Sequence, residues 1–254
     1  MKLIINCSGG IAGDMFTAAL ISAGADFEST RKNMLLIAEK LGQASINKNI
    51  TADGSTQLKI NLENNDFHLS GKKAEKLLKE ILDTIKFEKI YEDFALRILD
   101  ILINAEKKAH KENIFSEMNH THHHHHHDDA ILHEAQDIVV DIIGAVSGLR
   151  DLNVIPEAVL TGPVKTGGGK VTFSHGTLDI PAPATKVILD DFKINWEKGP
   201  IDHEICTPTG AAILAAIKVD DEIPAGYDIK SGRTGISRGS KILDIPPLKI
   251  YIPK

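Results

Sequence analysis

Residues 113–129 show no apolar periodicity, although the segments on both sides are patterned as helices. Such a run has no apolar face that could pack against a core. If it were buried, its polar groups would lose their hydrogen bonds to water without gaining new ones. It is therefore predicted to be a solvated loop, and the packed core has to come from the segments before and after it. With 254 residues, of which 42% are apolar, the chain can supply such a core.

The same loop carries the most unusual feature of the composition. Seven of the 12 histidines fall between residues 120 and 127, and Asp128 and Asp129 follow them. Neutral imidazole suits Ni, Zn, Cu or Co, whereas Mg and Ca prefer oxygen ligands. Adjacent histidines on a flexible loop cannot impose one rigid geometry, so the tract predicts a capture or storage arm for a transition metal. Purification tags stand at chain ends, so this internal run is better explained as native metal binding. The predicted ligands are His120, His122, His123, His124, His125, His126 and His127.

Charge, cysteine usage and the N-terminal sequence exclude several classes of protein. A formal net charge of −6 gives no support for a nucleic-acid partner. The N-terminus is too polar for a signal peptide, and no stretch approaches the roughly 18–20 apolar residues of a membrane span. Two cysteines cannot form a disulfide framework. We expect a cytoplasmic protein with no nucleic-acid or membrane partner, and homo-oligomerisation stays open.

Hydrophobic periodicity predicts an α+β fold, with a helix-rich part over residues 1–150 and a mixed strand and loop part over residues 151–254. The first part is expected to hold a strand at 3–5, helices at 11–24, 29–41, 74–85, 87–111 and 130–149, and a hairpin at 46–62 that turns at Asp53-Gly54. The second is expected to hold strands at 159–164, 171–173 and 248–252, with helices that start near Pro183 and Thr207.

Three turns rich in glycine or in threonine and proline could bind a phosphate or carboxylate. The first is the glycine-rich turn at residues 8–14, after the strand at 3–5, and the second is the glycine run before Lys170. The third places Thr207 as an N-cap, with Pro208 at the first helical position. A plain β-hairpin connection and ordinary helix capping would explain the second and third equally simply. The candidate anion-binding residues are Gly10, Gly13, Gly167, Gly168, Gly169, Lys170, Thr207, Thr209 and Gly210.

The helix predicted after the histidine tract carries acids beside glycines. His133, Asp137 and Asp141 are spaced i, i+4 and i+8, so they would share one face with Gly144 and Gly148, opposite an apolar face. Small residues beside acids suggest the close approach of a ligand or of another backbone. This face is a second candidate metal site, and an ordinary solvated face is an equally simple interpretation.

A series of motifs in a fixed order resembles the LarC family of nickel insertion proteins. The segment 6–15, NCSGGIAGDM, is similar to the family's DCFSGISGDM signature, and a histidine-rich loop and His133-Glu134 follow in the family's order. The resemblance continues through five further segments to residue 212. They are residues 137–144, 167–169, 174–176, 181–185 and 207–212.

This resemblance implies insertion of Ni²⁺ into pyridinium-3,5-bisthiocarboxylic acid mononucleotide, which completes the nickel-pincer cofactor of lactate racemase. It implies a CTP-dependent nickel chelatase, a metal-inserting lyase, that uses CTP with Mg²⁺ or Mn²⁺ and serves a lactate racemase-type apoenzyme. The glycine turns and Thr207-Pro208-Thr209 would then bind the substrate phosphate. Catalytic roles fall to Asp14 and His175, and the histidine tract would supply the metal.

The sequence departs from the family pattern in three respects that matter. Asn6 stands where the family has Asp, and the spacing between His133-Glu134 and Asp137 is two residues shorter than the pattern. The family's C-terminal CTP-binding domain has no counterpart before Lys254, so we expect the first half of a two-part enzyme with a separately made C-terminal half as partner. Two alternatives remain: a non-catalytic nickel storage protein, and a Mg²⁺-dependent phosphate-ester enzyme that uses Asp14.

Overall fold

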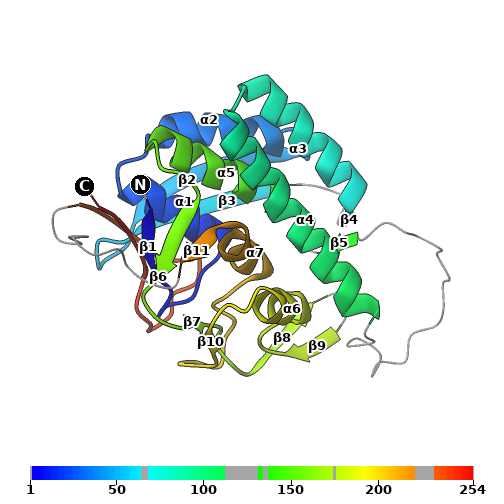
Figure 1. The fold of residues 1–254 in the computed structure, drawn as a ribbon, viewed down its shortest axis with the longest axis vertical. Helices are drawn as coiled ribbons and strands as arrows, with labels where there is room; N and C mark the ends of the chain where they lie inside the picture. Colours follow the sequence, from blue (N-terminus) through cyan, green and yellow to red (C-terminus); the bar gives the residue numbers. More distant parts are fainter. Residues whose placement is uncertain are drawn as a thin grey trace.

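The computed structural model describes residues 2–63, 68–111, 131–133, 137–173, 176–220 and 232–253. Its largest element is a mixed sheet of seven strands in the order β11-β6-β1-β13-β12-β3-β2 (Figure 1). These strands are β1 (Leu3–Asn6), β2 (Gln43–Ile50), β3 (Thr56–Glu63), β6 (Glu157–Leu160), β11 (Lys218–Asp220), β12 (Arg233–Ser237) and β13 (Leu248–Ile252).

The middle of this sheet joins segments that lie far apart in the sequence. β1 pairs parallel with β6 and antiparallel with β13, with Ile5 opposite Ile250. Along β13, Leu248, Ile250 and Ile252 are buried and alternate with half-buried residues, as expected for a sheet with one face against a core. Strands from both sides of residue 151 therefore share one sheet, and the division into two parts stays a prediction from composition.

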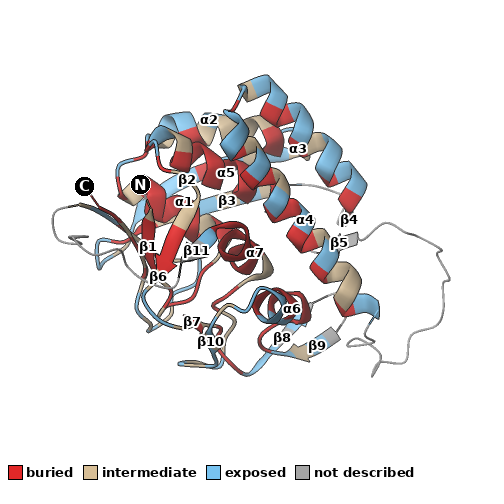
Figure 2. Cartoon of the chain, in the orientation of Figure 1, coloured by how far each residue is buried: buried red, intermediate tan, exposed pale blue. Residues whose placement is uncertain are grey.

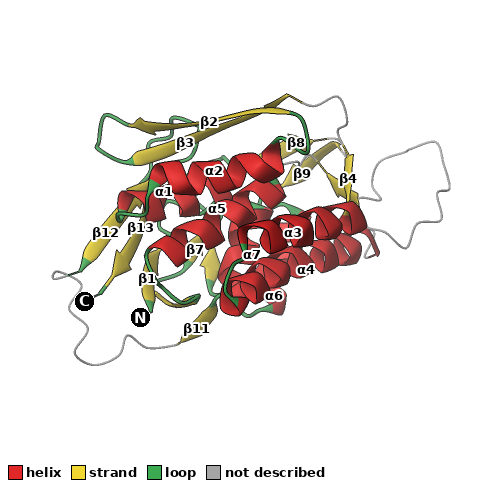
Figure 3. Cartoon of the chain, turned by 90° about the horizontal axis from the view of Figure 1, so that it is seen from above, coloured by secondary structure: helices red, strands yellow, loops and turns green. Residues whose placement is uncertain are grey.

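Helices pack against one another beside the sheet. They are α1 (Gly13–Ser22), α2 (Phe27–Ala38), α3 (Gly71–Ile85), α4 (Lys89–Lys111), α5 (Ile138–Asp151), α6 (Pro183–Asp191) and α7 (Pro208–Ala216). α1 contacts β3, β12 and β13. α5 packs against α1 and also contacts α2 and α4. Figure 3 shows the long β2–β3 hairpin running beside α1 and α2.

Two helices, α5 and α7, are buried along almost their whole length. α5 is buried from Ile138 through Leu149, and α7 from Thr209 to its end at Ala216 (Figure 2). A helix that is apolar all round belongs in the interior of a domain. Three two-stranded ribbons complete the described structure. They pair β4 (His68–Ser70) with β5 (Ile131–His133), β7 (Val164–Lys165) with β10 (Trp196–Glu197), and β8 (Lys170–Phe173) with β9 (Gly176–Asp179).

The α+β class is confirmed, and so are most of the elements predicted from periodicity. Two predictions are wrong. The helix expected over 130–149 begins only at Ile138, because residues 131–133 form β5, in which His133 pairs with His68. The strand expected over 159–164 is two strands, β6 and β7, that belong to different sheets. The predicted loop at 113–129 lies outside the described residues. Within the described residues, no helix is long and apolar enough to cross a membrane.

Candidate functional site

A cavity of about 570 Å³ opens where the N-termini of four helices meet. Its wall contains the first residues of α1, α5, α6 and α7, and further residues from α4, β3 and the segment after β12. Each helix N-terminus presents backbone N–H groups without intrahelical partners and a partial positive charge. Four such ends around one cavity favour an anionic ligand such as a phosphate.

The N-terminus of α7 is fixed to the turn that precedes α1. The Thr207 side chain accepts a hydrogen bond from the Gly210 N–H at 3.2 Å, and the Thr207 N–H donates to the Ile11 carbonyl at 3.0 Å. A Cβ on Gly210 would lie 2.2 Å from that carbonyl oxygen. Glycine at 210 therefore lets α7 approach the turn closely enough to place Thr207 and Thr209 in the cavity wall.

The N-terminus of α1 depends on two glycines in the same way. Gly10 has φ +80°, and a Cβ there would lie 1.9 Å from the Ile205 carbonyl oxygen. A Cβ on Gly13 would lie 2.2 Å from Oδ2 of Asp141 on α5. The missing side chain at Gly13 thus allows the Asp141 carboxyl group to sit directly against the start of α1.

Three aspartates from α1 and α5 form an acidic side of the cavity. Burial raises the pKa of Asp14 to about 6. The Met15 N–H donates a hydrogen bond to the Asp14 carboxylate at 2.7 Å, which lowers this pKa, and the charge of Asp137 raises it further. Burial also raises the pKa of Asp137, although this residue keeps contact with solvent. Burial, followed by the charges of Asp137 and Asp14, raises the pKa of Asp141 well above its usual range. Oδ1 of Asp141 has no hydrogen-bond partner among the described residues.

Two glutamates face the same cavity from other elements. Burial raises the pKa of Glu106, on α4, to about 7. Burial likewise raises the pKa of Glu204 to about 7, against the opposing effects of the Lys241 charge and a backbone hydrogen bond from Ala182. Carboxyl groups that titrate near neutral pH can exchange protons with a ligand, which is typical of acid–base sites.

Two buried thiols lie behind this wall. Cys7 and Cys206 are unoxidised, and both are buried. Burial raises the pKa of Cys7 to about 12. The pKa of Cys206 is also raised, mainly by burial and then by the charges of Cys7 and Glu204. Neutral thiols of this kind behave as small apolar side chains. In the part of the chain that the structure describes, no three His, Cys, Asp or Glu side chains are grouped so that they could hold a metal ion.

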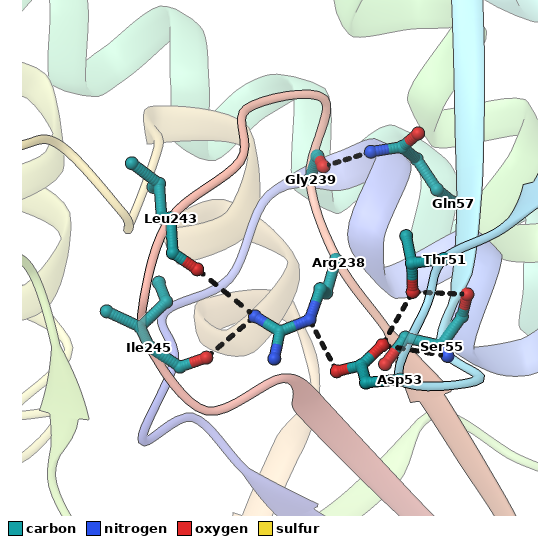
Figure 4. Close-up of polar contacts among 8 residues, drawn as sticks. All are labelled: Thr51, Asp53, Ser55, Gln57, Arg238, Gly239, Leu243 and Ile245. Atoms are coloured by element: carbon teal, nitrogen blue, oxygen red, sulfur yellow. Dashed lines mark hydrogen bonds and ion pairs between the residues drawn. The ribbon is translucent and has the colours of Figure 1, made fainter.

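Residues 238–247, here called the wall loop, close one side of the cavity and are held by Arg238. Its Nε donates to Asp53 Oδ2 at 2.7 Å, and its Nη1 donates to the carbonyls of Leu243 and Ile245 at 3.5 and 2.6 Å (Figure 4). The Thr51 hydroxyl and then Arg238 hold the pKa of Asp53 well below its usual range. The β2–β3 turn and the wall loop are thereby fixed to each other.

Arg238→Ala is expected to lower the free energy of unfolding by about 2 kcal/mol, because it leaves two loop carbonyls and the Asp53 carboxylate without their charged donor. Denaturant unfolding of the variant beside the wild type measures this loss. Arg238→Lys is the matched control: it keeps the charge but cannot reproduce the planar fork, so it should recover only part of the stability. Equal stability of Arg238→Ala and wild type would show that the wall loop does not need this anchor.

Comparison with known proteins gives the chain a family. The profile of the family described as nickel insertion protein matches residues 3–252. The chain belongs to that family. Relatives named pyridinium-3,5-bisthiocarboxylic acid mononucleotide nickel insertion protein include those of Staphylococcus saprophyticus and Alkaliphilus metalliredigens. The first is 33% identical over 96% of this chain and 57% of its own length, and the second is 30% identical over 98% and 59%.

A third relative of the same name, from Akkermansia muciniphila, is 32% identical over 85% of this chain and 51% of its own length. The chain therefore spans a little over half the length of the curated relatives that it matches. No solved structure matches the chain.

The structure brings some of the candidate site residues predicted from the sequence together and leaves others apart. Six predicted residues line the cavity: Gly13, Asp14, Asp137, Asp141, Thr207 and Thr209. Gly10 and Gly210 lie just behind it, packed against backbone. Glu106, Glu204 and Arg238 also line it, although no sequence motif singled them out.

Other predicted residues lie elsewhere. Gly167, Gly168 and Gly169 pack against residues 201–205, where a Cβ on Gly167 would lie 1.7 Å from the His203 carbonyl oxygen, and they are not part of the described cavity wall. Lys170 is exposed, 4.0 Å from Asp179. The histidine tract from His120 to His127 and the predicted catalytic His175 lie outside the described residues.

The predicted shared face of His133, Asp137 and Asp141 is wrong. His133 belongs to β5, and only the two aspartates belong to the start of α5. The glycines beside them have a packing role: a Cβ on Gly144 would lie 2.8 Å from Thr17 Oγ1, and one on Gly148 would lie 2.9 Å from Leu20 Cδ1. These glycines therefore do not lie on an ordinary solvated face. They allow the close approach of another helix, α1.

Proposed function

We propose that this chain inserts nickel into pyridinium-3,5-bisthiocarboxylic acid mononucleotide, the substrate named for its relatives. The observation that carries the proposal is the cavity itself. It combines helix N-termini suited to a phosphate with carboxyl groups suited to a cation, in a chain of the nickel insertion family. A mononucleotide that must accept a divalent metal needs both kinds of group.

The parts of the cavity divide between the two reactants. The N–H groups at the start of α7, with the hydroxyls of Thr207 and Thr209, would hold the substrate phosphate. The acidic side, with Asp14 and Asp141, would attract the nickel ion, which here is a substrate. Carboxylates are weak ligands for nickel compared with imidazole and thiolate, so they could release the metal to the sulfur atoms of the mononucleotide. The histidine tract would raise the local nickel concentration.

The remaining features of the activity belong to the same proposal. We infer that CTP, with Mg²⁺ or Mn²⁺, is used by the portion of the relatives that this chain does not cover, and that insertion requires that portion. The product would activate a lactate racemase-type apoenzyme in the cytoplasm. The test mixes this chain with Ni²⁺, CTP and the nickel-free mononucleotide, with and without the C-terminal half of a relative. Each mixture is then added to lactate racemase apoenzyme, and the racemase activity that appears is measured. Failure of both mixtures would refute the proposed function.

Deletion of residues 120–127 is expected to leave insertion intact at saturating nickel and to slow it when nickel is scarce, because the tract only supplies metal. The number of nickel ions bound per chain should fall in the same variant. Replacing the seven histidines by serine, with the length kept, controls for the shortened loop. If the chain is instead a nickel storage protein, deletion removes metal binding, and no insertion activity is found in either form.

A further inference from the structure

Insertion that joins nickel to a ring carbon of the mononucleotide releases a proton, which needs an acceptor in the cavity. In the mononucleotide named for the relatives, thiocarboxylates stand on carbons 3 and 5 of a pyridinium ring. A metal held by one sulfur of each group lies in the ring plane and faces carbon 4, which lies between them and carries a hydrogen. A bond between the metal and carbon 4 can form only as that hydrogen leaves.

We propose that Glu204 accepts this proton, an inference that rests on the proposed function. In the step, the C4–H bond breaks and its electron pair becomes the bond between carbon and nickel. The proton passes to the Glu204 carboxylate, which becomes a neutral carboxylic acid and later returns the proton to water. Nickel stays in the +2 state, so the step needs no oxidant or reductant.

The position of Glu204 suits this role. Glu204 lies in the short segment that leads into α7, two residues before Cys206 and three before the N-cap Thr207. Its side chain lines the cavity. Its carboxylate takes a backbone hydrogen bond from Ala182, at the start of α6. Its Oε1 is buried and has no hydrogen-bond partner among the described residues. A buried carboxylate oxygen without a donor is costly, and such groups in native proteins call for a functional explanation.

The surroundings of Glu204 leave it a base near neutral pH. Burial raises its pKa to about 7, and the Lys241 charge, which faces it from the wall loop, opposes that rise. Lys241 also lies 2.7 Å, Nζ to Nε2, from His203. Cys206 is close enough to Glu204 for their charges to interact, and burial, followed by the charges of Cys7 and Glu204, raises the pKa of its thiol. The other charged groups of the described cavity wall are Asp14, Lys59, Glu106, Asp137, Asp141 and Arg238.

Glu204 fits the role better than the other cavity carboxyls. Asp14 already accepts the Met15 N–H at 2.7 Å, and that bond reduces its basicity. Asp141 is 6% exposed and sits against Gly13, so it is less accessible to a ring held in the cavity. Glu106 lies on α4, whereas Glu204 is joined directly to the helix N-terminus that would hold the substrate phosphate.

The experiment uses the full chain with the C-terminal half of a relative, Ni²⁺, CTP and the mononucleotide carrying either hydrogen or deuterium at carbon 4. Glu204→Gln is expected to slow insertion by about 10²-fold or more. Nickel and mononucleotide binding, measured separately by equilibrium dialysis, should stay within about 3-fold of wild type, and Glu204→Asp should recover part of the rate. Wild-type insertion should show a deuterium isotope effect and should increase with pH through the Glu204 titration. Glu80→Gln, which removes an exposed carboxylate outside the cavity wall, is the matched control.

Each result decides between the two proposals. Insertion by Glu204→Gln within about 3-fold of wild type, with an unchanged pH profile, would overturn the role of Glu204 and leave the proposed function standing. A Glu204→Gln variant that is folded but has lost mononucleotide binding would overturn it too, since the residue would then serve binding. Absence of insertion by the wild type would overturn both.

Discussion

Lowering the pH from 8 to 5.5 is expected to raise the free energy of unfolding by about 2–4 kcal/mol, the reverse of ordinary acid destabilisation. The cause is the set of carboxyl groups buried around the cavity. Burial raises the pKa of Asp14 from 3.8 to about 6, and it raises the pKa of Glu106 and Glu204 from 4.5 to about 7. The folded chain therefore binds these protons at a higher pH than the unfolded chain does.

The sign and the pH window follow from those pKa values. Each group's contribution is complete below its unfolded pKa, near 4, and is lost as pH rises through its folded pKa, near 6 to 7. One pKa unit corresponds to about 1.4 kcal/mol. Asp14, Glu106 and Glu204 are only partly buried, however, and solvent screens them, so the gain stays well below the sum of the full shifts. The lowered pKa values of His110 and His203 oppose it. Below about pH 4, protonation of Asp53 and Asp190 reverses the trend.

Urea unfolding at pH 5.5, 6.5, 7.5 and 8, in buffer with a chelator to keep metal from the histidines, measures the effect. The triple variant Asp14→Asn, Glu106→Gln and Glu204→Gln should be less dependent on pH and more stable than wild type at pH 8. A wild type whose stability is constant or falls between pH 8 and 5.5 would mean that the cavity carboxyls ionise as they do in water.

Local elements of the fold could be predicted from the sequence because local chemistry determines them. Asp53-Gly54 is a turn sequence between alternating segments, and the hairpin turns there. Thr207-Pro208 is an N-cap followed by a proline at the first helical position, and α7 begins at Pro208. At such positions one or two side chains favour a single backbone conformation.

The sheet order and the start of α5 could not be predicted in the same way. β1 pairs with β13, which lies near residue 250, and periodicity carries no information about such distant partners. Around residue 133, the spacing of His133, Asp137 and Asp141 suits a helix, but residues 131–133 pair with β4 instead. Tertiary pairing outweighed local periodicity there, and the shared face predicted from that periodicity does not exist.

The candidate site was predictable only where a motif marked it. Gly13-Asp14 and Thr207-Pro208-Thr209 stand out in the sequence, and they line the cavity. Glu106 and Glu204 do not stand out, since a single glutamate in a helical or loop segment usually faces solvent. Only the fold reveals that their carboxyl groups are buried. For Glu204, the adjoining Thr-Pro-Thr motif was the one sequence signal that could have directed attention to it.

Gly210→Ala is expected to lower the free energy of unfolding by about 2–4 kcal/mol and to weaken mononucleotide binding. Alanine favours a helix over glycine by about 1 kcal/mol, so helix propensity alone predicts the opposite. The new Cβ would lie 2.2 Å from the Ile11 carbonyl oxygen and 2.6 Å from its carbon. Ile11 cannot move freely, because its N–H donates to the Ile205 carbonyl and its own carbonyl accepts the Thr207 N–H. The clash has to push the N-terminus of α7 away from the turn before α1.

Gly162→Ala is the matched control, because a Cβ there has no described atom within 4 Å and Gly162 does not have a positive φ. Its stability should stay within about 0.5 kcal/mol of wild type. Denaturant unfolding measures the stabilities, and calorimetric titration with the nickel-free mononucleotide measures binding. If Gly210→Ala binds the mononucleotide as tightly as Gly162→Ala does, the phosphate does not bind at the N-terminus of α7. If the two variants are equally stable, the close approach of α7 to Ile11 is not required by the fold.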